Sequence, residues 1–258
     1  MNGIYVFHGV DHKVGTTMVA QSAAEMLADR CTDKKVLFAA LNGRESMDYV
    51  REKTESVDAM KDRVENRLLN TSELQRLCVR AGKMYLLAGT VNEEYERCYM
   101  PENAVYILEA AAKLFDIIVV DAGNNIDNGL AVGAISVCGE LFLVMTQQES
   151  ILARWEKRQR IYERLRIVPD VYVLNRYFEK DIYPADYVAR RCGKEGERFG
   201  RVRFVYSGRR AEIERKTLLN YPEDGFRADI ARLAAPIAEH YGYAEQERKR
   251  KKLWKNFI

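Results

Sequence analysis

A loop containing glycine and threonine follows the first apolar segment of the sequence. Residues 8–17 read HGVDHKVGTT, and a helical pattern begins at Thr16. A phosphate-binding loop uses glycines so that backbone N–H groups can contact phosphates, a lysine that reaches the terminal phosphates, and a hydroxyl that ligates Mg²⁺. Gly9, Gly15, Thr16 and Thr17 are present here, but no lysine precedes the threonines. The loop therefore has the outline of a phosphate site without its usual charge.

Two more polar residues come at the ends of apolar runs. Asp121 ends the run FDIIVVD, and Asn175 ends the run VYVLN. In parallel α/β sheets, ligands bind at the carboxyl ends of the strands. We therefore expect Asp121 and Asn175 to share one rim with the loop, where the Asp121 carboxylate would hold a metal-bound water. The simpler interpretation is an aspartate that only ends a strand.

The interior of the loop differs from a glycine-rich phosphate loop. Lys13 and His12 lie inside it, where they either face solvent or partly replace the missing charge. Val14 is β-branched and resists a positive φ, which predicts a distorted loop. Asp11 adds a negative charge that would repel a triphosphate. These residues predict weak phosphate binding.

Short β-rich runs alternate with helical patterns along the chain. The expected strands are residues 3–8, 35–41, 84–88, 116–121, 140–146, 170–174 and 202–206. The expected helices lie near residues 16–29, 45–69, 72–81, 102–114, 150–165, 185–191 and 225–241. Residues 72–75, SELQ, fit a capping box, and Pro101 suits the first turn of a helix. The alternation predicts an α/β fold with a doubly wound, mainly parallel sheet.

Composition and length bound the organisation of the chain. The 258 residues are 47% hydrophobic and 31% charged, as in globular proteins. There is no apolar run of about 18 residues and no basic leader before a long apolar run, so we expect a cytoplasmic protein without a transmembrane helix. Five widely spaced cysteines without a C-x-x-C motif predict reduced thiols. We expect one domain over residues 1–244 and a tail over residues 245–258.

The end of the chain combines basic and aromatic residues. Residues 248–258, RKRKKLWKNFI, carry six basic side chains and no acidic one, so removing them changes the net charge from +3 to −3. On a helix the apolar members would share one face. The residues of this candidate membrane contact are Lys251, Lys252, Leu253, Trp254, Phe257 and Ile258. The pattern predicts binding to an anionic membrane surface; an unidentified protein partner, nucleic acid and an inert tail are the alternatives.

Five segments in order resemble the MinD/ParA family of deviant P-loop ATPases, over nearly the whole chain. They are VDHKVGTT at 10–17, ALN at 40–42, FDIIVVD at 115–121, VMTQQES at 144–150 and VYVLN at 171–175. The resemblance implies a P-loop NTPase fold, a homodimer, and ATP or ADP with Mg²⁺ as ligand, or no ligand at all. The nucleotide-binding residues it implies are Lys13, Gly15, Thr16, Thr17, Asp121 and Asn175. Of these, Thr16 and Asp121 would hold Mg²⁺, through water, if nucleotide binds.

The departures from the family motif remove charge. Gly15 stands where the family has its phosphate-contacting lysine, and Val10 where it has the lysine that reaches across the dimer. Ala40 and Asn42 stand where the family has two aspartates, so only Asp121 remains of the charged catalytic groups. Removing one such group typically lowers the rate about 100- to 1000-fold. The chain is therefore similar to the degenerate, TadZ-like members of the family.

We expect a localisation or scaffold factor on the inner face of a membrane, with a degenerate nucleotide site and weak or no ATP hydrolysis. Two alternatives stay open. In the first, the protein is an active ATPase in which Lys13 replaces the usual lysine. In the second, it is a nucleic-acid-binding relative of the partition ATPases that uses the tail and the basic segment 209–216.

Overall fold

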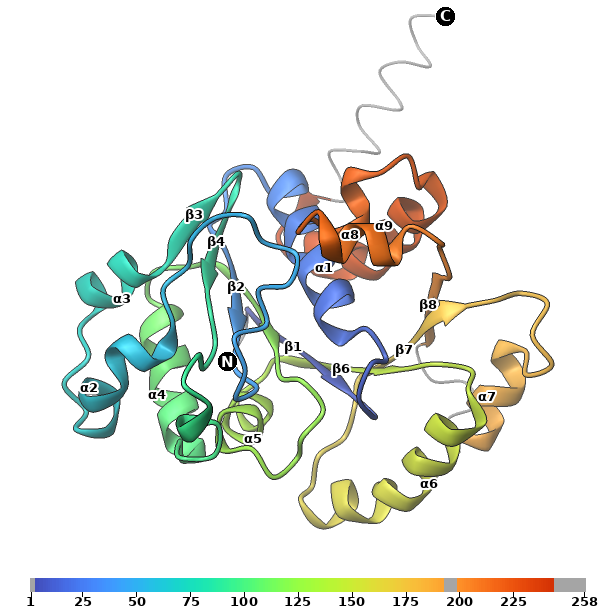
Figure 1. The fold of residues 1–258 in the computed structure, drawn as a ribbon, viewed down its shortest axis with the longest axis horizontal. Helices are drawn as coiled ribbons and strands as arrows, with labels where there is room; N and C mark the ends of the chain where they lie inside the picture. Colours follow the sequence, from blue (N-terminus) through green and yellow to red (C-terminus); the bar gives the residue numbers. More distant parts are fainter. Residues whose placement is uncertain (1–2, 193–198, 244–258) are drawn as a thin grey trace, which may run out of the picture.

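The fold is a single α/β domain built on one sheet. The computed structural model describes residues 3–192 and 199–243 (Figure 1). Its eight strands have the order β3-β4-β2-β5-β1-β6-β7-β8; β3 is antiparallel to β4, and all other pairs are parallel. The strands are β1 Ile4–Gly9, β2 Val36–Ala40, β3 Val79–Ala81, β4 Met84–Leu87, β5 Ile117–Asp121, β6 Glu140–Met145, β7 Val171–Tyr177 and β8 Phe199–Arg203. The predicted doubly wound, mainly parallel sheet is confirmed.

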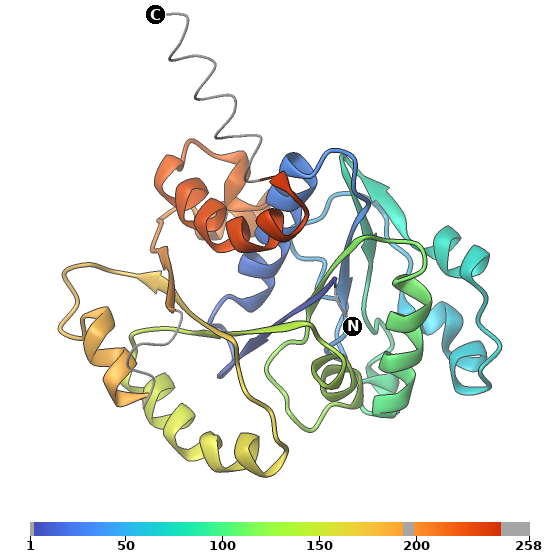
Figure 2. The same ribbon diagram turned by 180° about the vertical axis from the view of Figure 1, so that it is seen from behind.

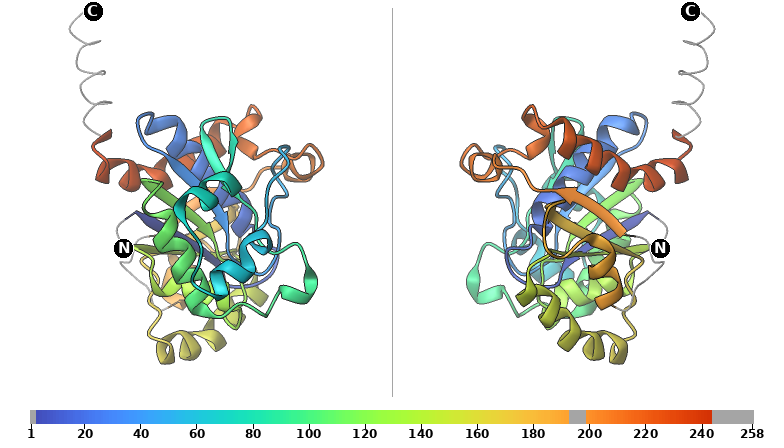
Figure 3. Two further views of the ribbon diagram at one scale, coloured as in Figure 1. Left: turned by 90° about the vertical axis from the view of Figure 1, so that its left-hand side faces the viewer. Right: turned by 90° about the vertical axis from the view of Figure 1, so that its right-hand side faces the viewer.

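Helices cover both faces of this sheet. The α-helices are α1 Thr16–Arg30, α2 Lys61–Glu65, α3 Thr71–Leu77, α4 Pro101–Ala111, α5 Gly129–Ser136, α6 Glu149–Arg164, α7 Ala185–Arg191, α8 Gly208–Ile213 and α9 Asp224–His240. Short 3-10 turns are η1 Val57–Met60, η2 Glu93–Tyr95 and η3 Leu218–Asn220. Figures 2 and 3 show α1, α8 and α9 on one face, with α4, α5 and α6 on the other. Every residue of β1, β2 and β5 is buried, because both faces of these strands are covered.

The first strand lies at the centre of the sheet. It pairs with β5 on one side and β6 on the other, and Phe7 is in register with Asp121. The loop after β1 therefore leaves the sheet beside the end of β5. This confirms the prediction that the strands beginning near residues 3 and 116 are neighbours. It also gives the reason why the 9–17 loop and Asp121 meet.

Two predicted helices are wrong in part. The segment 45–69 is mostly irregular, with η1 and α2 as its only helical turns. The helix predicted at 72–81 ends at Leu77, and the next residues form β3, which pairs with β4 as a hairpin through Gly82 at φ +57°. The cap of α3 is Asn70, whose Oδ1 accepts from the Glu73 N–H at 2.9 Å, instead of the predicted box at Ser72.

Other differences concern short elements. Helices α5 and α8 were not predicted, and the strand expected at 202–206 ends at Arg203. Pro101 does begin α4, as its fixed φ favours. Within the described residues no helix is long and apolar enough to cross a membrane. The five cysteines are free thiols, in agreement with the prediction.

A buried histidine closes the core beneath the end of β1. His8 is fully buried, and its Nδ1 lies 3.1 Å from the Ala122 carbonyl oxygen. Its ring lies 6.0 Å from that of Tyr162 on α6. Burial lowers the pKa of His8 to about 4, so the imidazole is neutral at physiological pH. His8 is thus part of the packing under the loop and does not face a ligand.

Candidate functional site

A cleft lies at the carboxyl ends of the central strands, between β1, β2, β5 and β7. Its volume is about 1090 Å³. The segments that line it are residues 11–18, 42–49, 123–125, 175–176 and 203–209, together with Glu212, Leu218 and Phe226. The loop after β1 and the start of α1 contribute lining residues to the cleft, and Figure 1 shows this loop between β1 and α1. This is the rim where the sequence placed the candidate site.

A threonine that lines the cleft pairs with a fully buried aspartate. Thr17 Oγ1 donates to Asp121 Oδ2 at 2.6 Å, and the Gly123 N–H donates to Asp121 Oδ1 at 2.9 Å. Thr16 is buried at the start of α1, and its Oγ1 lies 2.5 Å from where a Cβ on Gly9 would stand. Of the two threonines, Thr17 is therefore the one that faces Asp121.

Burial disfavours the ionised form of the Asp121 carboxyl. It is fully buried, and burial raises the pKa of Asp121 above its ordinary value. Hydrogen bonds from Thr17, the Gly123 N–H and Asn42 act in the opposite direction but do not outweigh burial. A cation placed beside Asp121 would favour its ionised form. A threonine hydroxyl next to a buried carboxylate is an all-oxygen donor set that suits Mg²⁺.

Gly15 leaves no room for a side chain. It precedes α1 with φ +85°, and a Cβ there would lie 2.4 Å from Asn175 Nδ2. The same Asn175 amide donates to the Val14 carbonyl oxygen at 2.7 Å. Asn175 therefore holds the loop and fills the space beside Gly15. A lysine at position 15 would need both a strained backbone and a displaced Asn175.

The start of α1 presents unbonded N–H groups to the cleft. The first hydrogen bond of the helix runs from the Val19 N–H to the Gly15 carbonyl oxygen at 3.1 Å. The preceding N–H groups have no intrahelical acceptor, and Gly15 as N-cap supplies no side chain for them. A helix start of this kind attracts anions through its N–H groups and the helix dipole. The α1 terminus is thus the natural place for a phosphate.

The left-handed backbone in the loop avoids the β-branched residue. Lys13 has φ +59° and Gly15 has φ +85°, whereas Val14, between them, does not have a positive φ. Val14 is 1% exposed and packs into the core. The valine therefore anchors the loop, and the strain that its β-branch would cause is avoided.

Two basic residues that line the cleft are Lys13, which the sequence analysis named, and Arg176, which it did not. Lys13 lines the cleft and is exposed, as the sequence suggested. Arg176 also lines it, and its Nε lies 4.0 Å from where a Cβ on Gly15 would stand. Arg176 lies within β7, at a register shift between Leu174 and Tyr177, and has a φ of +53°. Sequence reasoning stopped at Asn175 and missed its neighbour.

Side chains of α6 hold the loop from the other side. Asp11 forms an ion pair with Arg154 at 3.2 Å, so its charge is partly neutralised within the protein. Arg158 Nη1 donates to the Val10 carbonyl oxygen at 2.8 Å and to the Asn124 carbonyl oxygen at 2.9 Å. The repulsion expected from Asp11 is therefore reduced, and the loop is braced without a ligand.

The segment after β2 supplies polar but no strongly placed acidic groups. Asn42 is buried; its Oδ1 accepts from the Arg44 N–H at 2.9 Å, and its Nδ2 donates to Ser46 Oγ at 2.7 Å. Asp48 and Glu45, which sequence reasoning did not single out, line the cleft but are exposed. Asn42 cannot remove a proton from water, since an amide has no basic atom at neutral pH.

An aromatic pair stands at the mouth of the cleft. The rings of Phe204 and Tyr206 lie 5.0 Å apart in a T-shaped arrangement, and the two side chains are 42% and 91% exposed. Exposed rings of this size offer a surface for a flat ligand group. The prediction of a strand at 202–206 obscured this role. The tail residues Lys251, Lys252, Leu253, Trp254, Phe257 and Ile258 lie outside the described residues.

Solved structures with the same fold include a ParA family ATPase and MinD cell division proteins. A ParA family ATPase from Chlorobium tepidum is 17% identical with a TM-score of 0.78, covering 91% of this chain and 99% of that chain. The septum site-determining protein MinD from Pyrococcus horikoshii, complexed with Mg-ADP, is 18% identical with a TM-score of 0.71, covering 93% and 96%. MinD in the MinC:MinD complex of Aquifex aeolicus is 16% identical with a TM-score of 0.68, covering 90% and 96%.

These likenesses extend over nearly the full length of each chain, so the whole domain is shared. A scan of protein-family models finds no match, and neither does a search of curated proteins. At such low identity the comparison establishes the fold, and what the cleft does has to be argued from its own residues.

Proposed function

We propose that this chain, a protein with the MinD/ParA-type P-loop fold, is a localisation or scaffold factor that binds a Mg²⁺-nucleotide and hydrolyses it weakly or not at all. The P. horikoshii MinD structure holds Mg-ADP, which supports the choice of ligand. The observation that carries the weak-hydrolysis part is the glycine at the lysine position, where an added Cβ would lie 2.4 Å from Asn175 Nδ2 and could enter only if Asn175 shifted.

The residues of the cleft suit the binding part of this function. The N–H groups at the start of α1 would receive phosphate oxygens, and Arg176 and Lys13 would supply positive charge. Thr17 and Asp121 would hold Mg²⁺, which neutralises phosphate charge when bound. The exposed rings of Phe204 and Tyr206 would take the base.

Hydrolysis makes stricter demands than binding. Phosphoryl transfer depends on positioned charges that stabilise the transition state and on a group that orients the attacking water. Gly15 occupies the position of the usual lysine, and Asn42 occupies the position of the aspartate that would orient water. Each missing group lowers the rate about 100- to 1000-fold. A protein of this kind would act through occupancy of the cleft more than through turnover.

The test of the nucleotide site is a calorimetric titration of the full chain with ADP and ATP, with and without Mg²⁺. Arg176→Ala is expected to weaken binding about tenfold, because a charged hydrogen bond to phosphate is lost, and Lys13→Ala is expected to weaken it less. Lys113→Ala, an exposed lysine outside the cleft, is the matched control.

The rival interpretations predict other results. A larger loss with Lys13→Ala than with Arg176→Ala would support Lys13 as the substitute lysine. Release of phosphate at about 1 s⁻¹ or faster, a rate ordinary for enzymes, would contradict the weak-hydrolysis proposal. Absence of binding to the unmodified protein at millimolar nucleotide would contradict the nucleotide proposal itself.

We further propose that residues 248–258 bring the protein to an anionic membrane. Six basic residues near such a surface contribute about 1 kcal/mol each, and the apolar face of the segment would add insertion. The described body offers little support for nucleic acid, since Arg210 and Lys216 of the basic segment 209–216 both pair with Glu214.

Vesicle co-sedimentation tests the membrane role. The full chain is expected to sediment with vesicles rich in anionic lipid, and a truncation ending at Gln246 is expected to stay in the supernatant. Trp254→Glu should also reduce sedimentation if the segment inserts. Equal sedimentation of the full and truncated chains would remove the membrane role.

A further inference from the structure

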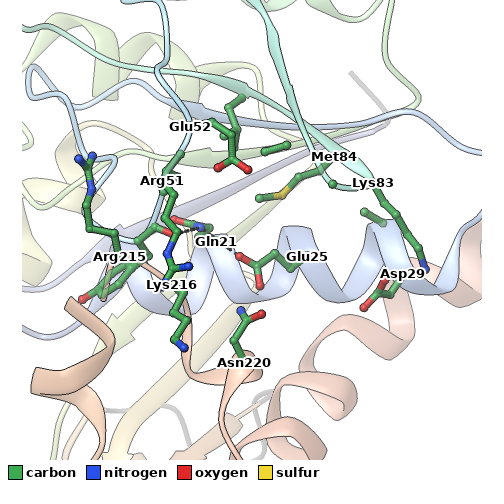
Figure 4. Close-up of a pocket in the computed structure, with 16 residues that line it drawn as sticks. Gln21, Glu25, Asp29, Arg51, Glu52, Lys83, Met84, Arg215, Lys216 and Asn220 are labelled. Atoms are coloured by element: carbon green, nitrogen blue, oxygen red, sulfur yellow. Dashed lines mark hydrogen bonds and ion pairs between the residues drawn. The ribbon is translucent and has the colours of Figure 1, made fainter. Parts of the chain in front are cut away.

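A second pocket lies along α1 beyond its first turn, and Tyr49 lines both this pocket and the cleft. Its volume is about 380 Å³. Four segments surround it: α1, residues 49–52, the β3–β4 hairpin, and residues 215–220 before and within η3. Figure 4 shows Gln21, Glu25 and Asp29 following one another along the pocket side of α1. The nucleotide cleft does not use these three side chains.

Glu25 is the central acid of the pocket. Its Oε2 accepts from Thr217 Oγ1 at 2.6 Å, and its Oε1 accepts from Gln21 Nε2 at 3.1 Å. Among the described residues, no lysine or arginine forms an ion pair with it. Burial therefore raises the pKa of Glu25, because no cation within the protein offsets the desolvated charge. A ligand that carries a positive group would supply the missing partner.

A buried glutamine on α1 lies beside Glu25. The residue is 1% exposed, and its Nε2 donates to Glu25 Oε1 and to the Tyr49 carbonyl oxygen, both at 3.1 Å. Exchanging the amide O and N would point the carbonyl at two acceptors, so this orientation is fixed by chemistry. Gln21 Oε1 has no hydrogen-bond partner among the described residues. Because this oxygen is itself buried, a ligand in the pocket does not reach it, and Gln21 acts by positioning the Glu25 carboxylate.

The rim of the pocket carries charges of both signs, with Asp29 and Glu52 as its acidic residues. Lys83 pairs with Asp29 at 2.9 Å, and Lys216 pairs with Glu214 at 2.6 Å, so the charges of these two lysines are compensated. The guanidinium groups of two arginines each make a hydrogen bond to a backbone carbonyl: Arg51 to Glu214 and Arg215 to Met47. Each guanidinium has five N–H donors, so most of them remain for a ligand.

The remaining wall is apolar. Val50, Met84 and Leu86 are buried and line the pocket beside Glu25. Figure 4 places Met84 across the pocket from α1. The pocket thus combines the Glu25 carboxylate, which Gln21 positions, with two arginines that have N–H donors left and with an apolar surface. An α-amino acid has the matching ammonium, carboxylate and side chain.

We propose that this pocket binds a free α-amino acid with an apolar side chain, its ammonium group on Glu25 and its carboxylate on Arg51. Both the ammonium and the carboxylate of the ligand are then paired with an opposite charge. A ligand with only one of these groups would make only one of the two pairs. The side chain lies against Val50, Met84 and Leu86. The proposal does not depend on nucleotide binding, since none of its contacts lies on the phosphate loop.

Isothermal titration of the full chain with leucine tests the proposal. Leucine is expected to bind with a Kd below about 1 mM. The two truncated analogues, 3-methylbutylamine without the carboxylate and 4-methylpentanoate without the ammonium, are expected to bind at least about tenfold more weakly. Glu25→Gln and Arg51→Ala should each weaken leucine about tenfold, whereas Glu163→Gln on the exposed face of α6 should leave it unchanged.

Several outcomes would overturn the assignment. One is the absence of saturable binding up to about 10 mM leucine, well above the affinity proposed. Another is equal binding of leucine and 3-methylbutylamine, which would mean that Arg51 takes no part. Because Glu25→Gln could impair folding, the far-ultraviolet circular dichroism of each variant is compared first. Arg51 is exposed, so Arg51→Ala carries the test independently.

Discussion

Gly15→Ala is expected to lower the free energy of unfolding by about 2–4 kcal/mol. A left-handed backbone costs a non-glycine residue about 1–3 kcal/mol, and displacement of Asn175 would break its hydrogen bond to Val14, worth about 1 kcal/mol. Gly242 offers a matched control, because its φ is +84° against +85° at Gly15, yet a Cβ there meets nothing within 4 Å. Urea unfolding of the two alanine variants therefore separates the steric contact from the backbone strain.

The same geometry determines what a restored lysine would do. Gly15→Lys is expected to lose stability at least as much as Gly15→Ala and to bind ADP no more tightly than the unmodified chain. The reason is that its Cβ would begin 2.4 Å from Asn175 Nδ2. A Gly15→Lys protein that is as stable as the parent and gains affinity would show that Asn175 moves easily, and would refute the account of the filled lysine position. Equal losses of unfolding free energy in Gly15→Ala and Gly242→Ala would mean that backbone strain alone explains the effect.

Asp121→Asn is expected to act in opposite directions on stability and on ligand binding. Because burial raises the folded-state pKa of Asp121 above its unfolded value, the ionised carboxylate destabilises the fold at pH 7. The neutral amide should therefore raise the thermal midpoint at pH 7. As the pH falls through the raised pKa, the unmodified protein takes up the proton and gains stability, so the difference between the two should shrink.

The loss in binding should appear only with the metal. Asparagine is a poorer partner for Mg²⁺ and its water than a carboxylate, and disruption of such partners typically costs about 10- to 100-fold in affinity. ADP titrations of Asp121→Asn should thus become insensitive to Mg²⁺. Asp48→Asn, which removes an exposed acid from the same cleft, is the control and should change neither property strongly. An unchanged Mg²⁺ response in Asp121→Asn would place the metal elsewhere.

The sheet and the position of the cleft were predictable from the sequence. Runs such as 117–121 are apolar throughout, which only strands covered on both faces tolerate, and polar residues at their carboxyl ends indicate the rim. The segment 45–69 was not predictable in the same way. Its helical pattern is interrupted because residues such as Met47 and Val50 are buried one by one against the domain, and tertiary packing outweighs local preference.

The chemistry of the loop depended on contacts between distant residues. That Asn175 fills the space beside Gly15 is a contact across 160 positions of the sequence, and no local pattern encodes it. Arg176 lines the cleft at a register shift in β7, which the sequence does not reveal. The role of Phe204 was hidden because a β-rich run predicts a strand equally well when it continues into a loop. Sequence reasoning located the cleft at the end of the sheet but not the contacts that shape the loop beside it.

The brace around the phosphate loop, made by Asn175, Arg154 and Arg158, has a consequence for timing. A loop that the protein's own side chains already hold gains little order when a ligand arrives, so binding changes its conformation little. A protein that times a process by hydrolysis needs two clearly different conformations, and the chemical step drives it from one to the other. A ligand shifts such states only by its differential affinity for them. Under the proposed function, the occupancy of the cleft would therefore follow the nucleotide concentration at each moment, and the protein would act as a concentration sensor.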